Sequence, residues 1–570
     1  MRQSLIVFLI LAAAGLVLAG QTRRAAPADG QPFTVVEATI REMQAAMEQH
    51  RITSREIVMQ YLIRIAIYED KLNAVITVNS KALEDAETRD HERAQGRIRG
   101  PLHGIPIALK DNIHTTDMPT TGGALAFDGL LPPYEATLTK NLREAGAIII
   151  AKTTMTELAN YVADVMPGNY NAVAGYGLNP YDPRRDPREA TADGRQALGT
   201  GGSSSGIGTA ASFWAANVGT ETSGSILTPA NQTMLVGIKP TVGRVSRYGV
   251  IPITADQDTA GPMAKTVTDA AILLGVLEST TPDPNDAATR RCTPAPGGDY
   301  TRVLNPGGLK GARIGIPRAF FYDRLTPPGG KDPLGGLNSD QAKVMAEAVA
   351  ILKQQGAILV DPADIPSITS TDPKSNFLLW PTCRGLANAK GKDADCSVVF
   401  KYGMKRDFNK WLASLGAAAP VKTLTELRQW NVAHQKAGAI KYGQAQLDIS
   451  DEMDVDGDRT RYQADRERDL LLSATQGIDA VMNQYELDAL LFPGSSGFVI
   501  AAKPGYPTVI VPFGVVPNAP TPPFPESFNA KPAPYGVSFS GTACSEPRLL
   551  ELAYAFEQTT KRRIPPASAP

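Results

Sequence analysis

Gly199-Thr-Gly-Gly-Ser-Ser-Ser-Gly206 is followed, after an alanine-rich run, by Val218-Gly-Thr-Glu-Thr-Ser-Gly-Ser225-Ile-Leu-Thr-Pro229. Two hydroxyl sites, at Ser203 and Ser225, therefore lie among closely spaced glycines. Because glycine has no side chain, its backbone can approach a ligand closely. A flexible glycine-serine linker is the alternative for the first run alone. Linkers do not continue into apolar segments, so the second run favours a pocket lined by backbone and two serine hydroxyls.

A lysine at the end of a short apolar strand upstream is a third candidate polar group. Residues 104–109 read Gly-Ile-Pro-Ile-Ala-Leu and end at Lys110. A lysine at the end of a strand most often extends its amine to solvent. A functional interpretation instead requires a buried, partly neutral amine, and the sequence leaves both open.

Helices alternate with apolar strands along the chain, which favours an α/β fold. Thr53-Ser-Arg-Glu56 fits a helix capping box, and Val58, Tyr61, Leu62 and Ile65 follow at the spacing of one buried helix face. Further elements are predicted as follows: a helix ending at Gly146 and a strand over 147–151; a long loop over 167–199; a helix over 208–217; a helix containing 267–274; a strand within 310–317; a helix containing 345–352 and a strand over 357–360; mostly helix over 365–480; strands within 487–493, 505–512 and 536–541; and a helix over 549–558.

The N-terminus resembles an export signal. Met1-Arg2 is followed by an apolar run from Leu5 to Ala19, with small residues at its end. This pattern predicts a signal peptide over 1–19, cleaved after Ala19, and a secreted or periplasmic protein. An uncleaved anchor is the alternative, but the run is short for a span of about 20 residues. No stable membrane insertion is therefore expected after cleavage, and residues 20–32 form a polar N-terminal segment.

Composition narrows the range of partners. The 570 residues include 57 basic and 58 acidic ones, which gives a formal net charge of −1. No basic stripe or arm is present, so nucleic acid is not expected as a partner. The chain is long enough for several domains or for one large α/β domain.

Cysteines and acidic residues give no metal signature. Cys292, Cys383, Cys396 and Cys544 can form disulfides outside the cytosol. Cys383 and Cys396 are the nearest pair, and buried free thiols are an equal alternative. No Cys-x-x-Cys occurs and the five histidines are scattered. Residues 454–458 resemble a calcium loop, but Gln463 stands where a bidentate glutamate is needed. We therefore expect no metal and no cofactor.

Two kinds of serine catalysis fit these residues. Residues 202–206 match Gly-x-Ser-x-Gly with Ser204 as nucleophile, but the preceding segment is not a strand and only His434 lies downstream as a base. In the second kind, burial lowers the pKa of a lysine below its ordinary value of about 10.4, so that its amine accepts a hydroxyl proton. This chemistry needs no histidine, and Lys110 is the candidate base.

The motifs around these residues resemble, in order, the amidase signature family of serine hydrolases. The likeness extends from about residue 35 to residue 558. It implies a single large α/β domain over 33–562, with a mixed central β-sheet flanked by α-helices. The motifs are Gly104-Ile-Pro-Ile-Ala-Leu-Lys110-Asp-Asn-Ile, Gly201-Gly-Ser203-Ser-Ser-Gly206, Gly219-Thr-Glu-Thr-Ser-Gly-Ser225-Ile and Gly237-Ile-Lys-Pro-Thr241, with weaker likeness at 260–263, 505–508 and 544–550.

The resemblance implies an amidase that hydrolyses carboxylic or peptide amides through an acyl-enzyme. Ser225 corresponds to the nucleophile, Ser203 to the bridging serine that follows a cis peptide bond, and Lys110 to the base. The implied oxyanion hole consists of the backbone amides of Thr222, Ser223, Gly224 and Ser225. The substrate is expected to be a small-molecule or peptide amide. Thr121-Gly-Gly123 and the 167–199 loop are expected to shape the pocket.

The sequence departs from the family pattern at two points. Ser203 and Ser225 are 22 positions apart, about two fewer than is usual, so the helix between them must be shortened. Leu227 stands where many members have arginine, which weakens any transfer of their substrate preference. The alternatives are a Ser-His-Asp esterase and a catalytically silent exported binding protein. A cytosolic transamidation subunit shares the same motifs, but the signal sequence argues against that role.

Overall fold

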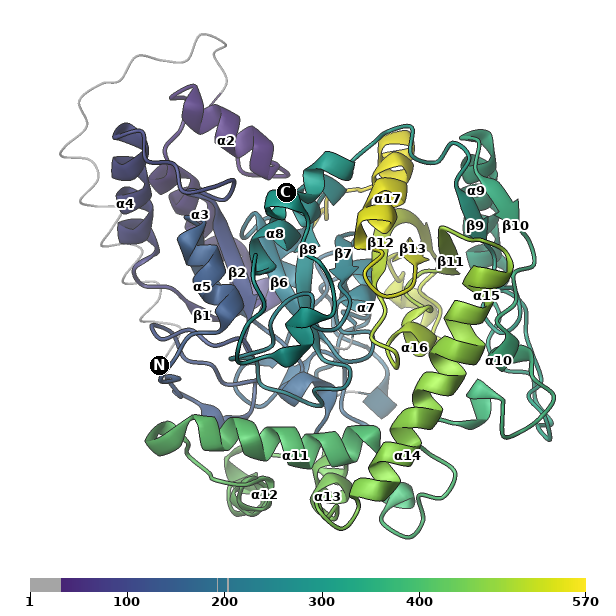
Figure 1. The fold of residues 1–570 in the computed structure, drawn as a ribbon. Helices are drawn as coiled ribbons and strands as arrows, with labels where there is room; N and C mark the ends of the chain where they lie inside the picture. The colour runs from purple at the N-terminus through teal and green to yellow at the C-terminus, as the bar shows by residue number, and fades with distance from the viewer. Residues whose placement is uncertain (1–31, 192, 202–204) are drawn as a thin grey trace.

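The computed structural model describes residues 32–191, 193–201 and 205–570. Its centre is a mixed sheet of eleven strands, which pair in the order β1-β3-β2-β6-β8-β7-β12-β13-β11-β9-β10 (Figure 1). Helices flank this sheet, so the expected single α/β domain is confirmed. The strands are β1 (Val75–Val78), β2 (Pro106–Lys110), β3 (Ile148–Thr153), β6 (Ala216–Glu221), β7 (Val236–Lys239), β8 (Thr259–Ala264), β9 (Arg313–Gly315), β10 (Ile358–Val360), β11 (Ala489–Pro493), β12 (Thr508–Val516) and β13 (Ala533–Ser540), with a separate hairpin of β4 (Tyr170–Asn171) and β5 (Gly175–Tyr176).

The helices fall into two groups by position. One group packs near the sheet: α2 (Ile40–Glu48), α3 (Ser54–Leu72), α4 (Ala82–Ala94), α5 (Thr137–Glu144), α6 (Ile207–Ala210), α7 (Leu227–Gln232), α8 (Val267–Leu277), α9 (Ser339–Gln354), α10 (Pro366–Thr369), α15 (Asp479–Gln484), α16 (Phe498–Ala501) and α17 (Glu546–Thr560). The other lies along the lower edge of the molecule in Figure 1 and is called the helical layer: α11 (Val399–Ser414), α12 (Leu424–Ala433), α13 (Ala445–Asp451) and α14 (Arg459–Leu470).

Local signals predicted most of these elements. The capping box at Thr53 and Glu56 is present at the start of α3, and Val58, Tyr61 and Ile65 are buried. β2 is buried along its whole length and lies between the parallel strands β3 and β6. A strand in this position excludes water from both of its faces, so its side chains are apolar up to Lys110.

The predicted helix over residues 208–217 is wrong. Only α6 is helical there, and the chain turns at Ser212, whose φ is 54°. It then forms β6, which pairs with β2 on one side and β8 on the other. Small residues fit both conformations, and pairing at the centre of the sheet outweighs the helix propensity of alanine. The segment between the two serines therefore holds a four-residue helix and a strand.

All four cysteines form disulfides. Cys292 is bonded to Cys544, and Cys383 is bonded to Cys396. The second pair is the one that sequence distance favoured, whereas the alternative of buried free thiols is wrong.

The acidic turn that resembles a calcium loop binds its own backbone. The Asp454 carboxylate accepts hydrogen bonds from the N–H groups of Asp456 and Gly457, each at 3.0 Å. Asp458 forms an ion pair with Lys390 at 2.7 Å. These carboxylates are therefore already paired within the protein.

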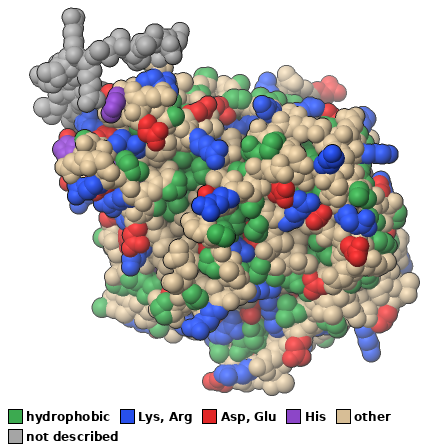
Figure 2. All heavy atoms as spheres, turned by 45° about the horizontal axis from the view of Figure 1, so that its top comes forward, with side chains coloured by type: hydrophobic (Ala, Val, Ile, Leu, Met, Phe, Trp, Pro, Cys, Tyr) green, Lys and Arg blue, Asp and Glu red, His purple; other side chains and the backbone are tan. Residues whose placement is uncertain are grey.

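Charges are mixed on the surface. Basic and acidic side chains alternate on the face shown in Figure 2, with apolar side chains between them. Among the described residues, no helix combines the length and the apolar character needed to cross a bilayer. The predicted signal peptide, residues 1–19, lies outside the described part of the chain.

Candidate active site

Lys110 is a buried amine at the end of β2. Its side chain is fully buried, and Nζ donates to the backbone oxygen of Thr220 at 3.1 Å and to its Oγ1 at 2.9 Å. Burial lowers the pKa of Lys110 to about 7, although the carboxylates of Glu221 and Asp258 act in the opposite direction. The solvent-exposed interpretation of this lysine is therefore wrong, and the amine is in the protonation range of a general base.

Thr220 joins the lysine to a second polar group. Asn112 Nδ2 also donates to Thr220 Oγ1, at 3.0 Å. Both side chains are buried, and they connect β6 to the segment just after β2. Sequence reasoning did not single out Thr220 or Asn112, although both lie inside the motifs that it used.

Ser225 lies in a tight turn between β6 and α7. Its side chain is buried, and only 8 % of the residue is exposed. Gly224, directly before it, has φ +91°, and a Cβ at this position would lie 3.1 Å from Phe498 and from Thr228 Oγ1. A left-handed conformation without room for a side chain explains why glycine precedes the serine.

The buried Glu221 side chain stabilises this turn by hydrogen bonding. Its Oε2 accepts the backbone N–H of Ile226 at 2.7 Å and that of Leu227 at 2.9 Å. The carboxylate is buried, so these bonds connect the end of β6 to the start of α7 in a water-poor setting. Sequence reasoning missed Glu221, because a carboxylate that braces a turn has no local signature. Leu227 is buried as the first residue of α7.

Ser203 and Ser204 lie outside the described residues. Ser205 is buried, and its Oγ points to the sulfur of Met263 at 3.5 Å. The segment that follows is fixed by two arginines. Arg64 donates to the backbone oxygens of Ala211 and Ser212, and Arg563 donates to that of Ala210 at 3.2 Å.

Two small hollows lie beside Asn112. Each has a volume of about 10 Å³, which is roughly the space of one water molecule. Leu158, Ala159 and Asn160 form a turn at one wall with φ values of 42°, 56° and 69°. Strained backbone of this kind is typical of functional sites. The residues shared by both hollows are Asn112, Ala159, Ile251 and Ile253, and Gly122 of the Thr121-Gly-Gly123 motif lines one of them.

His434 is engaged elsewhere. It follows α12 in the helical layer, where its Nδ1 lies 2.8 Å from the backbone oxygen of Trp430. The imidazole also stacks on the Trp430 ring, with centroids 3.8 Å apart. These contacts belong to the helix end and give no support to a Ser-His-Asp arrangement.

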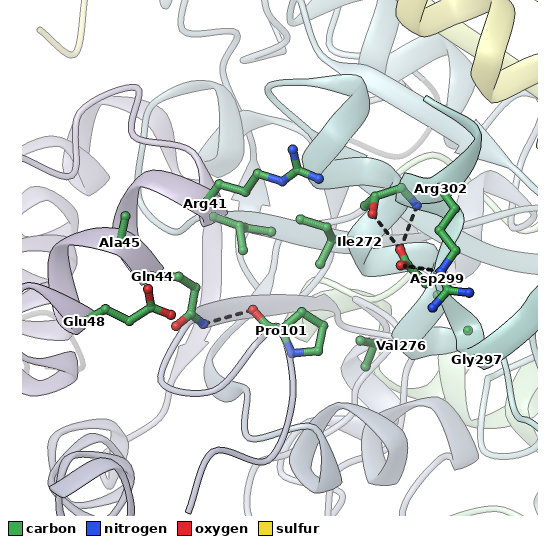
Figure 3. Close-up of a pocket in the computed structure, with 14 residues that line it drawn as sticks. Arg41, Gln44, Ala45, Glu48, Pro101, Ile272, Val276, Gly297, Asp299 and Arg302 are labelled. Atoms are coloured by element: carbon green, nitrogen blue, oxygen red, sulfur yellow. Dashed lines mark hydrogen bonds and ion pairs between the residues drawn. The ribbon is translucent and has the colours of Figure 1, made fainter. Parts of the chain in front are cut away.

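A larger hollow of about 610 Å³ lies away from these groups, between α2 and α8 (Figure 3). Gln44 Nε2 donates to the backbone oxygen of Pro101 at 2.9 Å, and Arg302 is paired with Asp299. None of the predicted catalytic residues that the structure describes lines this hollow.

Comparisons with known proteins agree with one another. The family model described as Amidase matches residues 56–550. A probable amidase of Arabidopsis thaliana is 32% identical over 541 residues, which cover 94% of this chain and 92% of that protein. The solved native peptide amidase of Stenotrophomonas maltophilia has 33% identity and a TM-score of 0.77, covering 94% of this chain and 99% of that chain. An amidase family protein of Bacillus anthracis has 30% identity and a TM-score of 0.75, covering 93% and 92%.

Proposed function

Because the chain belongs to the amidase family, we propose that it cleaves amide C–N bonds through a relay of Lys110, Ser203 and Ser225. The chain is an amidohydrolase by family and by its relatives. The observation that supports the relay is the amine of Lys110, which is fully buried beside the strand that leads to Ser225. A buried amine with a pKa of about 7 can accept a proton at neutral pH.

In the proposed reaction, the Ser225 oxygen attacks the amide carbonyl and transfers its proton to Ser203. Ser203 passes its own proton to the neutral Nζ of Lys110. When the tetrahedral intermediate collapses, the leaving nitrogen takes a proton from Ser203, which recovers one from Lys110. The acyl group then remains as an ester on Ser225, and a water molecule hydrolyses it by the same path in reverse.

The turn between β6 and α7 supplies the proposed oxyanion hole. Backbone N–H groups of residues 222–225 stabilise the negative oxygen of the intermediate, and one such donor contributes about 3 to 4 kcal/mol. Glu221 supports this arrangement because it binds the two N–H groups that follow the turn. A turn that is already ordered needs no reorganisation during the reaction.

We propose a peptide amide or a small carboxylic amide as substrate. The similarity to the Stenotrophomonas maltophilia peptide amidase, at 33% identity over nearly all of both chains, supports this class. We also propose that the protein is exported. The two disulfides support export, because such bonds persist in oxidising compartments.

The test is hydrolysis of a panel of primary, aryl and peptide amides. Ser225→Ala and Lys110→Ala should each lower kcat by about 10⁴- to 10⁶-fold, as expected for members of one catalytic unit. A fluorophosphonate should label one site per chain, at Ser225. Ser205→Ala is the matched control, because the Ser205 hydroxyl faces Met263, and it should keep most of the activity.

Two results would contradict the proposal. If His434→Ala abolishes activity while Lys110→Ala does not, the enzyme uses a Ser-His-Asp mechanism. If the wild-type protein turns over none of the amides and resists the fluorophosphonate, it is a silent binding protein.

A further inference from the structure

We propose that Asp258 is a positioning residue that fixes the oxyanion turn through the side chain of Thr222. The inference rests on the proposed function of residues 222–225. Asp258 precedes β8, far from Lys110 and Ser225 in sequence, and none of the catalytic motifs contains it.

Thr222 is held at two of its atoms. Its Oγ1 donates to Asp258 Oδ1 at 2.5 Å, and its backbone oxygen accepts from Gln257 Nε2 at 3.2 Å. Thr222 is the first residue after β6 and the first of the four residues in the proposed oxyanion turn. The orientation of the peptide units that follow it therefore depends on Gln257 and Asp258, the two residues just before β8.

Asp258 is itself fixed by backbone. Its Oδ2 accepts the N–H groups of Ile253 at 2.9 Å and of Thr254 at 3.0 Å. The carboxylate thus uses one oxygen to hold its own loop and the other to hold Thr222. Hydrogen bonds to an ionised acceptor are about twice as strong as neutral ones, so ionised Asp258 is a rigid link between the two segments.

The loop that carries Asp258 is tied in turn to the helical layer. Asp256 accepts from Tyr462 at 2.8 Å and forms an ion pair with Arg406 at 3.1 Å. The N–H of Ala255 donates to Asp407 at 2.7 Å. Contacts with α11 and α14, as well as with the sheet, therefore hold the oxyanion turn in position.

The turn has a brace at each end. Glu221 binds the N–H groups of Ile226 and Leu227 after it, and Asp258 binds the side chain at its start. Between the two braces lies Gly224, which can adopt many backbone conformations. A misplacement of about 1 Å at a catalytic group can cost about 100-fold in rate. Loss of one brace should therefore slow the chemical step more than it weakens binding.

The experiment compares Thr222→Val with Thr222→Ser in the full-length enzyme on a peptide amide. Valine keeps the shape of threonine and removes the hydroxyl, whereas serine keeps the hydroxyl. We expect Thr222→Val to lower kcat by about 10- to 100-fold with little change in KM. Thr222→Ser should retain most of the wild-type kcat. A peptide aldehyde, which forms a tetrahedral adduct on the nucleophile, should lose affinity for Thr222→Val in proportion to kcat/KM, while the product carboxylic acid should not.

Thr137→Val is the matched control. Thr137 Oγ1 donates to Asp283 at 2.5 Å, the same kind of bond outside the site. Thr137→Val should leave kcat and aldehyde affinity unchanged. If Thr222→Val does not fold, Thr222→Ala removes the same hydroxyl in a smaller side chain and should give the same pattern.

The inference is overturned if Thr222→Val, or Thr222→Ala in its place, retains wild-type kcat and aldehyde affinity. It is also overturned if KM and kcat change together and serine does not rescue. Failure of the proposed function is distinguishable, because either the wild-type enzyme would then be inactive or Lys110→Ala would retain activity.

Discussion

Several lysines are buried near the site, and they differ in the groups that surround their amines. Lys152 lies 3.4 Å from Asp111, also buried, and is therefore paired with an opposite charge. Lys239 donates to the backbone oxygen of Tyr506 at 2.7 Å, and burial lowers its pKa to about 8. In the described part of the chain, the hydrogen bonds of Lys110 Nζ go to the two oxygens of Thr220, and burial lowers the pKa of Lys110 to about 7. Of Lys110 and Lys239, Lys110 has the lower pKa, so its amine is neutral at lower pH.

The pH dependence of catalysis should follow Lys110. Its pKa in the folded protein is lowered, to about 7, so the amine is charged below this pH and neutral above it. Because the base must be neutral, kcat/KM should rise about tenfold per pH unit below pH 7 and level off above it. Steady-state kinetics from pH 5 to pH 9 measure this limb.

Two variants identify the group whose titration causes the rise of kcat/KM below pH 7. Thr220→Val removes an acceptor that stabilises the ammonium form and should move the limb to lower pH. Burial also raises the pKa of Asp258 to about 7, so the profile should be repeated with Asp258→Asn, which leaves one group to titrate. A flat profile in the wild-type enzyme would exclude Lys110 as the base.

At the scale of elements, close packing of α11 controls the loop that carries Asp258. Gly403 in α11 has no side chain, so the helix packs directly against Thr254. A Cβ at this position would lie 2.2 Å from Thr254 Oγ1 and 2.5 Å from its Cβ. Thr254 donates its N–H to Asp258, so contact with the helix is transmitted to the proposed brace of the oxyanion turn. The glycine therefore permits a helix-to-loop distance that the site depends on.

Gly403→Ala should lower kcat although the residue is far from Lys110 in sequence. The added methyl group must displace Thr254, and overpacking of this kind costs about 1 to 3 kcal/mol of stability. Kinetics on a peptide amide and thermal unfolding measure the two effects. Thr254→Gly removes the clashing atoms, so the double variant Gly403→Ala/Thr254→Gly should recover activity relative to Gly403→Ala. Wild-type kinetics for Gly403→Ala would argue against this transmission.

At the scale of the whole molecule, the two disulfides join distant parts. Cys292 and Cys544 are 252 positions apart, and their bond connects the segment after α8 to the residues just before α17. Cys383 and Cys396 are 13 positions apart and lie just before α11. In the chain-entropy model a loop of 13 residues contributes about 3 kcal/mol and one of 252 residues about 5.5 kcal/mol.

Protein recovered from an exported fraction should contain both disulfides and begin at Gly20. Peptide mapping by mass spectrometry without reductant measures both. Cys383→Ser/Cys396→Ser and Cys292→Ser/Cys544→Ser should each lower the unfolding temperature, the second pair by more, while kcat is retained in the folded protein. Four free thiols in protein from an oxidising compartment would contradict the pairing and weaken the proposal of export.

The sequence alone determined the fold class, most helices and strands, and the candidate residues Lys110 and Ser225. These are recorded locally, in apolar periodicity, capping residues and glycine spacing. Tertiary structure decided what depends on residues far apart. The 216–221 segment is a strand because it fills the space between β2 and β8. Lys110 is buried because β2 is an interior strand, and Asp258 acts as a brace because its partner Thr222 comes from another segment. Burial and pairing are properties of neighbours in space, so no local pattern could have supplied them.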